Sequence, residues 1–113
     1  MTGGTKVVAT FNSVRPDQVP TMNTQEARRL IDEQLARYRT MGYTALLRLL
    51  DAQDTFELEG AGGTKYQVEI SAIWDRQEGG DLRVMGCIDD GGWRAFVPLS
   101  SDFIIRPDST PID

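Results

Sequence analysis

The chain has 113 residues with 17 acidic and 12 basic side chains, and its net charge of −5 leaves no basic excess to neutralise the phosphates of a nucleic acid. It contains no histidine, which excludes Ser-His-Asp and Cys-His catalysis and any zinc site with a histidine ligand. Its single cysteine, Cys87, excludes an all-cysteine zinc site, CxxC redox chemistry and an internal disulfide. We therefore expect one domain that binds no metal and no cofactor.

The two ends of the chain are expected to lie outside the domain, which spans residues 24–106. Residues 1–23 contain the short β-prone run Lys6–Phe11, and this arm is an edge strand, a segment that packs on a neighbouring subunit, or partly disordered. Residues 107–113 form a C-terminal tail. The start of the chain lacks the basic and apolar regions of a signal peptide, and no apolar run is long enough to span a membrane. The single cysteine also favours a reducing compartment, so we expect a soluble, cytoplasmic protein with no membrane partner.

A helix is expected to begin after Asn23, because Asn23 and Glu26 fit a capping box. Its apolar residues recur at helical spacing on one side: Ala27, Leu30, Ile31, Leu35 and Tyr38. Gly42 is expected to end it, since glycine is the usual helix terminator. Tyr43–Asp51 then favours a second, shorter helix, with a buried strand as the alternative. The apolar residues of that helix share one side: Tyr43, Leu46, Leu47 and Leu50.

Alternating apolar and polar residues predict a series of strands in the rest of the chain. Their expected bounds are Thr55–Glu59, Lys65–Trp74, Leu82–Asp89, Trp93–Leu99 and a short final Phe103–Ile105. In Lys65–Trp74 the core residues are every second one: Tyr66, Val68, Ile70, Ala72 and Trp74. The predicted fold class is therefore α+β, with one or two N-terminal helices packed on one face of an antiparallel four- to five-stranded β-meander.

The sequence Asp89-Asp90-Gly91-Gly92 between two alternating runs predicts a hairpin, because Asp and Gly tolerate the positive φ of a tight turn. With Asp90 and Gly91 as the turn residues, the pairs expected across the hairpin on the core face are Ile88–Trp93, Gly86–Ala95, Val84–Val97 and Leu82–Leu99. A shift of one residue would mix apolar and polar side chains on that face.

The same register assigns the remaining side chains to the opposite face, which we call the second face. If Trp74 pairs with Leu82, two rows cross it: Glu69-Cys87-Arg94 and Ser71-Met85-Phe96. An exposed sheet face is usually polar, yet this one also carries Ile73 and Pro98, so we expect the arm, a second subunit or a ligand to cover it. The candidate ligand or partner residues are Glu69, Ser71, Ile73, Met85, Cys87, Arg94 and Phe96.

No catalytic residue is assigned by these patterns. The Glu69-Cys87-Arg94 row is an anion site or, more simply, a cross-strand ion pair, and no nearby base is evident to lower the pKa of Cys87. Acidic side chains are expected to gather at one end of the sheet: Asp75, Glu78, Asp81 and Asp102. They favour a solvated turn over a Ca²⁺ or Mg²⁺ site, because Arg76 opposes a cation and the spacing is not that of an EF-hand.

The part of the chain from Gly63 to Phe103 resembles a group of small uncharacterised bacterial proteins. The motifs that carry the resemblance are Gly63–Glu69, Trp74-Asp75, Gly79–Val84, Ile88–Leu99 and Asp102–Ile104. No activity is known for that group. The resemblance therefore implies a stand-alone bacterial domain and transfers no functional residue.

Three classes of function remain. The first is a small non-enzymatic protein-interaction module that self-associates or binds a protein partner through the second face, because an uncovered apolar patch is typically an interaction surface. The second is a small-molecule-binding protein with a pocket over Ile73, Met85, Phe96 and Arg94. The third is an enzyme that uses carboxylate, Tyr or Cys chemistry.

Overall fold

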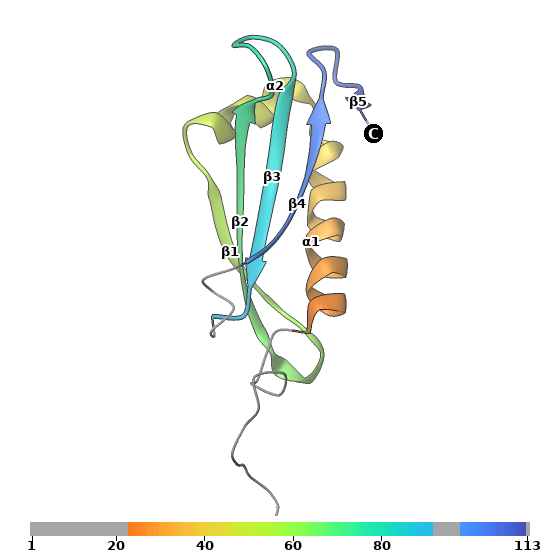
Figure 1. Ribbon diagram of the computed structural model, residues 1–113, viewed down its shortest axis with the longest axis vertical. Helices are drawn as coiled ribbons and strands as arrows, with labels where there is room; N and C mark the ends of the chain where they lie inside the picture. The colour runs from red at the N-terminus through yellow and green to blue at the C-terminus, as the bar shows by residue number, and fades with distance from the viewer. Residues whose placement is uncertain (1–22, 92–97, 113) are drawn as a thin grey trace, which may run out of the picture.

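The computed structural model describes residues 23–91 and 98–112. It confirms the α+β fold: two helices pack on a five-stranded antiparallel sheet whose strands follow chain order from β1 to β5 (Figure 1). The helical elements are α1 (Thr24–Arg39), α2 (Tyr43–Leu46) and the 3-10 turns η2 (Leu47–Leu50) and η3 (Ala61–Gly63). The strands are β1 (Asp54–Glu59), β2 (Lys65–Trp74), β3 (Leu82–Asp89), β4 (Leu99–Ile105) and β5 (Pro111–Ile112).

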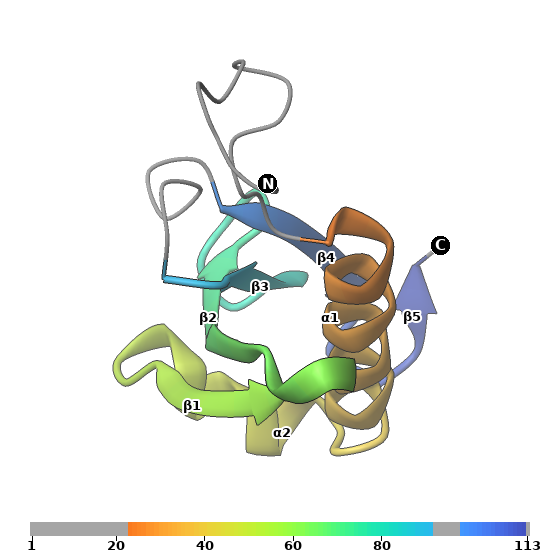
Figure 2. The same cartoon turned by 90° about the horizontal axis from the view of Figure 1, so that it is seen from below.

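The sheet curves around α1. Figure 2, which looks nearly along the helix, shows β1, β2, β3 and β4 arranged in an arc beside it. One face of the sheet is therefore covered by α1, while the second face is turned away from it. In the part of the chain that the structure describes, no helix is long and apolar enough to cross a membrane.

The predicted core is confirmed in most of its members. On α1 the buried residues are Ala27, Ile31, Leu35 and Tyr38, and on β2 they are Tyr66, Val68, Ile70 and Ala72. From β3 and β4 the buried apolar residues are Leu82, Val84, Ile88, Phe103 and Ile105. Leu30 and Trp74 are only partly buried at the edge of this core. The alternation in β2 and β3 therefore sorts core from surface as expected.

The start of α1 is tied to the sheet. Asn23 Oδ1 accepts a hydrogen bond from the Glu26 amide (3.1 Å), which confirms the N-cap. The Glu26 carboxylate in turn accepts from the Tyr66 hydroxyl (2.7 Å) and the Ala61 amide (2.8 Å). These bonds lower the pKa of Glu26, that from Tyr66 most. A Cβ on Gly60 would collide with Glu26 Oε1, so a side chain there would displace the carboxylate.

The second helix is shorter than predicted. The segment Tyr43–Asp51 forms α2 and then continues as the 3-10 turn η2, so the alternative of a buried strand is wrong. Its buried residues are Tyr43, Leu46 and Leu49, whereas Leu47 and Leu50 pack against the core only in part. A 3-10 turn has three residues per turn instead of 3.6, so Leu49 faces the core where an α-helix would have placed Leu50.

The predicted partner of β3 is wrong. Leu82 pairs with Ile105 instead of Leu99, and the observed pairs on the core face are Leu82–Ile105, Val84–Phe103, Gly86–Ser101 and Ile88–Leu99. The register differs by six residues from the predicted hairpin. Because six is even, the same β3 side chains still face the core. The predicted pairs with Trp93, Ala95 and Val97 are therefore replaced, and the predicted strand Trp93–Leu99 lies outside the described residues except for its end.

Packing against α1 explains this register. Phe103 is buried, and the Arg39 guanidinium of α1 lies 5.1 Å from the centre of its ring. The expected short strand Phe103–Ile105 is thus the second half of β4. The local turn signal is nevertheless real: the Gly91 amide donates to Asp89 Oδ1 (2.7 Å), and Gly91 has a φ of 77°. This turn starts a longer connection than a two-residue hairpin.

Part of the expected C-terminal tail belongs to the sheet. In β5, Ile112 pairs with Ile104 of β4. Ser109 Oγ accepts a hydrogen bond from the Tyr43 amide (2.9 Å), which joins this segment to the start of α2. Residues 107–112 therefore pack on the domain. The predicted N-terminal arm, apart from Asn23, lies outside the described residues.

Candidate functional site

Five of the seven predicted site residues share the second face of the sheet. They are Glu69, Ser71, Ile73, Met85 and Cys87. The predicted pairings that place them there are confirmed: Trp74–Leu82, Glu69–Cys87 and Ser71–Met85. All five side chains are at least partly exposed, because they alternate with the buried residues of β2 and β3.

The third residue of each predicted row across the second face differs from the prediction. Arg94 and Phe96 lie outside the described residues, and β4 supplies their positions: Ser100 stands opposite Cys87, and Asp102 stands opposite Met85. The row that was expected to end in an arginine ends in a hydroxyl, and the row that was expected to end in an aromatic ring ends in a carboxylate. The expected ion pair between Glu69 and Arg94 involves a residue outside the described part of the chain.

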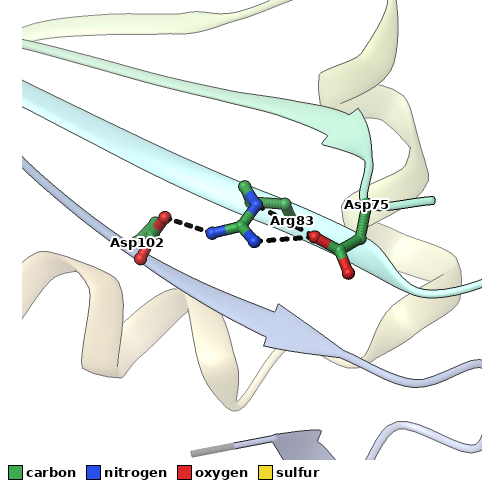
Figure 3. A network of polar contacts seen from close by, with 3 residues as sticks. All are labelled: Asp75, Arg83 and Asp102. Carbon is green, nitrogen blue, oxygen red and sulfur yellow. Dashed lines mark hydrogen bonds and ion pairs between the residues drawn. The ribbon is translucent and has the colours of Figure 1, made fainter.

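Arg83 is the residue that sequence reasoning did not select. Its Nη2 and Nε donate to Asp75 Oδ1 (2.7 and 3.0 Å), and its Nη1 donates to Asp102 Oδ2 (2.6 Å), as Figure 3 shows. The two carboxylates raise the pKa of Arg83, Asp102 more than Asp75. Alternation alone places Arg83 on the second face, but its contact with Asp102 depends on the register of β4.

This arrangement corrects the expected acidic cluster. Asp102 lies within β4, opposite Met85, and not in a turn at the end of the sheet. The Arg83 guanidinium lies between Asp102 and Asp75, where it neutralises much of their charge. Across residues 23–91 and 98–112, no group of three His, Cys, Asp or Glu side chains is arranged to hold a metal ion.

An apolar patch surrounds this ion-pair network. We define it by Ile73, Arg83, Met85 and Ile104. Ile73 and Ile104 are the neighbours of Arg83 on β2 and β4, so the aliphatic stem of Arg83 lies between two isoleucines. Ile73 is 48% exposed, which is the largest exposure of any bulky apolar side chain in the described chain. The patch is thus an uncovered apolar surface around an arginine that contacts two carboxylates, so the network of three side chains keeps one excess negative charge.

The opposite end of the second face is acidic. Its charged side chains, from β1 to β3, are Glu57, Glu59, Glu69, Asp89 and Lys65. Lys65 is paired with Glu59 at 3.2 Å, which leaves a clear acidic excess. The second face is therefore divided along the strands into an apolar patch and an acidic end.

A depression of about 320 Å³ lies next to the apolar patch. Its lining residues are Ser71, Met85, Cys87, Ser100, Ser101 and Asp102. This volume is at the lower end of the range for small-molecule sites. Only Met85 belongs both to this lining and to the predicted pocket, because Ile73 lies outside the depression and Arg94 and Phe96 are not among the described residues.

Cys87 is not an activated nucleophile. Burial raises the pKa of its thiol, and the neighbouring carboxylates of Glu69 and Asp89 raise it further. The thiol is therefore protonated at neutral pH, whereas a nucleophilic cysteine requires the thiolate. Comparisons of the chain with protein-family models, curated proteins and solved structures gave no match.

Proposed function

We propose that this protein is a non-enzymatic interaction module that self-associates through the apolar patch on the second face of its sheet. The observation that carries the proposal is the exposure of Ile73 beside Arg83, whose guanidinium is held by Asp75 and Asp102. α1 covers the first face, and no described element covers the second. An exposed apolar patch with a central arginine is typical of protein interfaces.

The size of the face limits the strength of the association. β2 has ten residues, which gives a face about 33 Å long at about 3.3 Å per residue. Four long strands about 4.8 Å apart make it about 19 Å wide. Two copies that covered the whole face would bury at most about 1,200 Å² in total, the lower limit for a specific interface, and overlap of the patches alone buries less. We expect a dissociation constant in the micromolar range.

The charge distribution selects one arrangement of the two copies. In one arrangement the twofold axis lies in the plane of the interface, passes through the patch and runs perpendicular to the strands. The two patches then face each other, and the two acidic ends lie at opposite ends of the dimer. An axis parallel to the strands would place Glu57 and Glu69 of both copies together, which costs free energy by like-charge repulsion. The first arrangement is therefore favoured, and it is a closed dimer.

Replacement of Ile73 by aspartate is expected to convert the dimer to a monomer. A carboxylate at this half-exposed position would add a third negative charge beside Arg83, which already binds Asp75 and Asp102, and would be buried in the interface, while the fold keeps its core. Sedimentation velocity from about 1 μM to 1 mM protein measures the change, and circular dichroism verifies the fold. The matched control is Met41→Asp, because Met41 is 46% exposed and lies outside the second face.

The proposal fails if the wild-type chain remains a monomer at the highest concentration. It also fails if Met41→Asp lowers the mass as much as Ile73→Asp does, because the effect would then reflect added charge and not the patch. A second variant in the patch, Met85→Asp, is expected to give the same loss as Ile73→Asp.

The depression favours one second candidate, a small polar ligand bound by the serine hydroxyls and the Asp102 carboxylate. In that case a screen of small amines and polyols would find compounds that raise the melting temperature of the wild-type chain. Ser100→Leu, which fills the depression, would abolish the shift, and Thr55→Leu on the same face would retain it. A screen without a stabilising compound, or a shift that survives Ser100→Leu, would eliminate this candidate.

A further inference from the structure

The outer edge of β1 exposes backbone hydrogen-bonding groups. The Gly60 amide donates to the Thr64 carbonyl (2.7 Å), which continues the ladder between β1 and β2. Hydrogen-bonded pairs alternate along antiparallel strands, so the amides and carbonyls of Thr55, Glu57 and Glu59 point away from β2. All three residues are exposed, and no described strand pairs with this edge.

On the other side of the sheet, the outer side of β4 is covered, and the edge strand β5 has only two residues, one of them a proline. The outward carbonyl of Ser100 on β4 accepts a hydrogen bond from Arg28 Nη1 of α1 (3.2 Å). Ile104, farther along the same strand, pairs with Ile112 of β5. Exposed strand edges attract further strands, and proteins usually cover them in this way. With six residues, β1 is therefore the edge strand that offers the longer open edge in the described chain.

A groove runs beside this open edge, between β1 and α1. Its volume is about 310 Å³, and its lining residues are Gln34, Arg37, Tyr38, Met41, Phe56 and Leu58. Phe56 and Leu58 are half-buried on the helix side of β1, and Met41 is one of two exposed bulky apolar residues in the described chain. A strand added beside β1 would direct every second side chain into this groove.

The other side of the added strand would meet carboxylates. Glu57 and Glu59 are exposed on the second-face side of β1, so cross-strand partners with positive charge are favoured. Pairing with the β1 strand of a second copy about Glu57 is disfavoured, because this antiparallel register would bring like charges together. The occupant is therefore a different segment, with apolar side chains alternating with lysine or arginine.

We infer that the edge of β1 and its groove bind an extended basic peptide segment of a partner protein as an added β-strand. Backbone hydrogen bonds to Thr55, Glu57 and Glu59 would supply affinity, and the groove and the two glutamates would supply specificity. This site lies away from the apolar patch, so it is independent of self-association.

The test uses the full chain and the blocked peptide Lys-Val-Lys-Val-Lys-Val as the probe. Binding is expected to slow hydrogen exchange at the amides of Thr55, Glu57 and Glu59 by about tenfold or more, measured residue by residue by NMR. A Lys-Ser-Lys-Ser-Lys-Ser peptide has the same charge without the apolar side, and it is expected to give no such protection. Met41→Asp and Glu57→Lys are each expected to weaken binding by about fivefold.

Ile73→Asp is the matched control and is expected to bind the peptide as the wild type does. The inference is overturned if about 1 mM peptide leaves the three amides unprotected, or if the serine peptide protects them equally. It is also overturned if these amides are already protected in the free chain, because the edge would then be occupied by the chain itself.

Discussion

Raising the pH from 10 to 12 is expected to lower the free energy of unfolding by about 4 kcal/mol, roughly 2 kcal/mol from each of two tyrosines. Burial raises the pKa of Tyr66 to about 12, and its hydrogen bond to Glu26 adds to the increase. Burial also raises the pKa of Tyr38 to about 12, with a further contribution from Asp54, whose Oδ2 accepts from the Tyr38 hydroxyl at 2.5 Å. Both phenols therefore hold their protons more tightly in the folded chain than in the unfolded chain.

The sign of this dependence follows from the two pKa values. The stabilising contribution is complete below pH 10 and is lost as the pH rises through 12. Urea denaturation at a series of pH values measures it. In Tyr66→Phe the decrease with pH is expected to be about half that of the wild type. If the double variant Tyr38→Phe/Tyr66→Phe loses as much unfolding free energy between pH 10 and 12 as the wild type does, groups other than these two tyrosines are responsible.

Gly86→Val is expected to destabilise the fold by about 1 to 3 kcal/mol. Gly86 is on the core face of β3, and a Cβ there would lie 2.8 Å from Ile31 Cδ1 and 3.1 Å from Ile70 Cδ1. Both isoleucines are fully buried, so neither side chain moves freely. The glycine therefore sets how closely α1 approaches the sheet, and urea denaturation of the variant measures the cost.

A double-mutant cycle distinguishes this steric effect from a general loss of stability. Ile31→Val removes the Cδ1 atom that the new side chain would meet, and alone it is expected to cost about 0.5 to 1.5 kcal/mol. With Gly86→Val it is expected to cost less than the sum of the two single changes, because the new side chain occupies the vacated space. Strict additivity would contradict direct contact between the two positions.

Local alternation predicted most of the sheet. The bounds of β2 and β3 agree with the structure, as does their pairing from Trp74–Leu82 onward, since period-two patterns and Gly-rich turns are local signals. The partner of β3 was not predicted. Its choice depends on the contact of Phe103 with α1, which joins residues far apart in the chain and leaves no local pattern.

In the candidate site, too, the features set by local patterns were predicted and those set by distant contacts were not. Alternation places Glu69 and Cys87 on the second face, because one register of two neighbouring strands decides this. The Arg83 network could not be predicted, because Asp102 reaches Arg83 only in the observed register of β4. The groove beside β1 was missed for a related reason: Met41 follows α1, and nothing in the sequence indicates that it lies near Phe56.

The difference between the two edges of the sheet has a consequence for polymerisation. A chain of subunits joined edge to edge needs two complementary free edges on every subunit. In the described part of this protein, Arg28 and β5 contact the outer side of β4, and the edge strand β5 has only two residues, so β1 offers the one long open edge. Edge-to-edge joining of the described domains therefore lacks the second long edge that a continuous cross-β row of subunits needs.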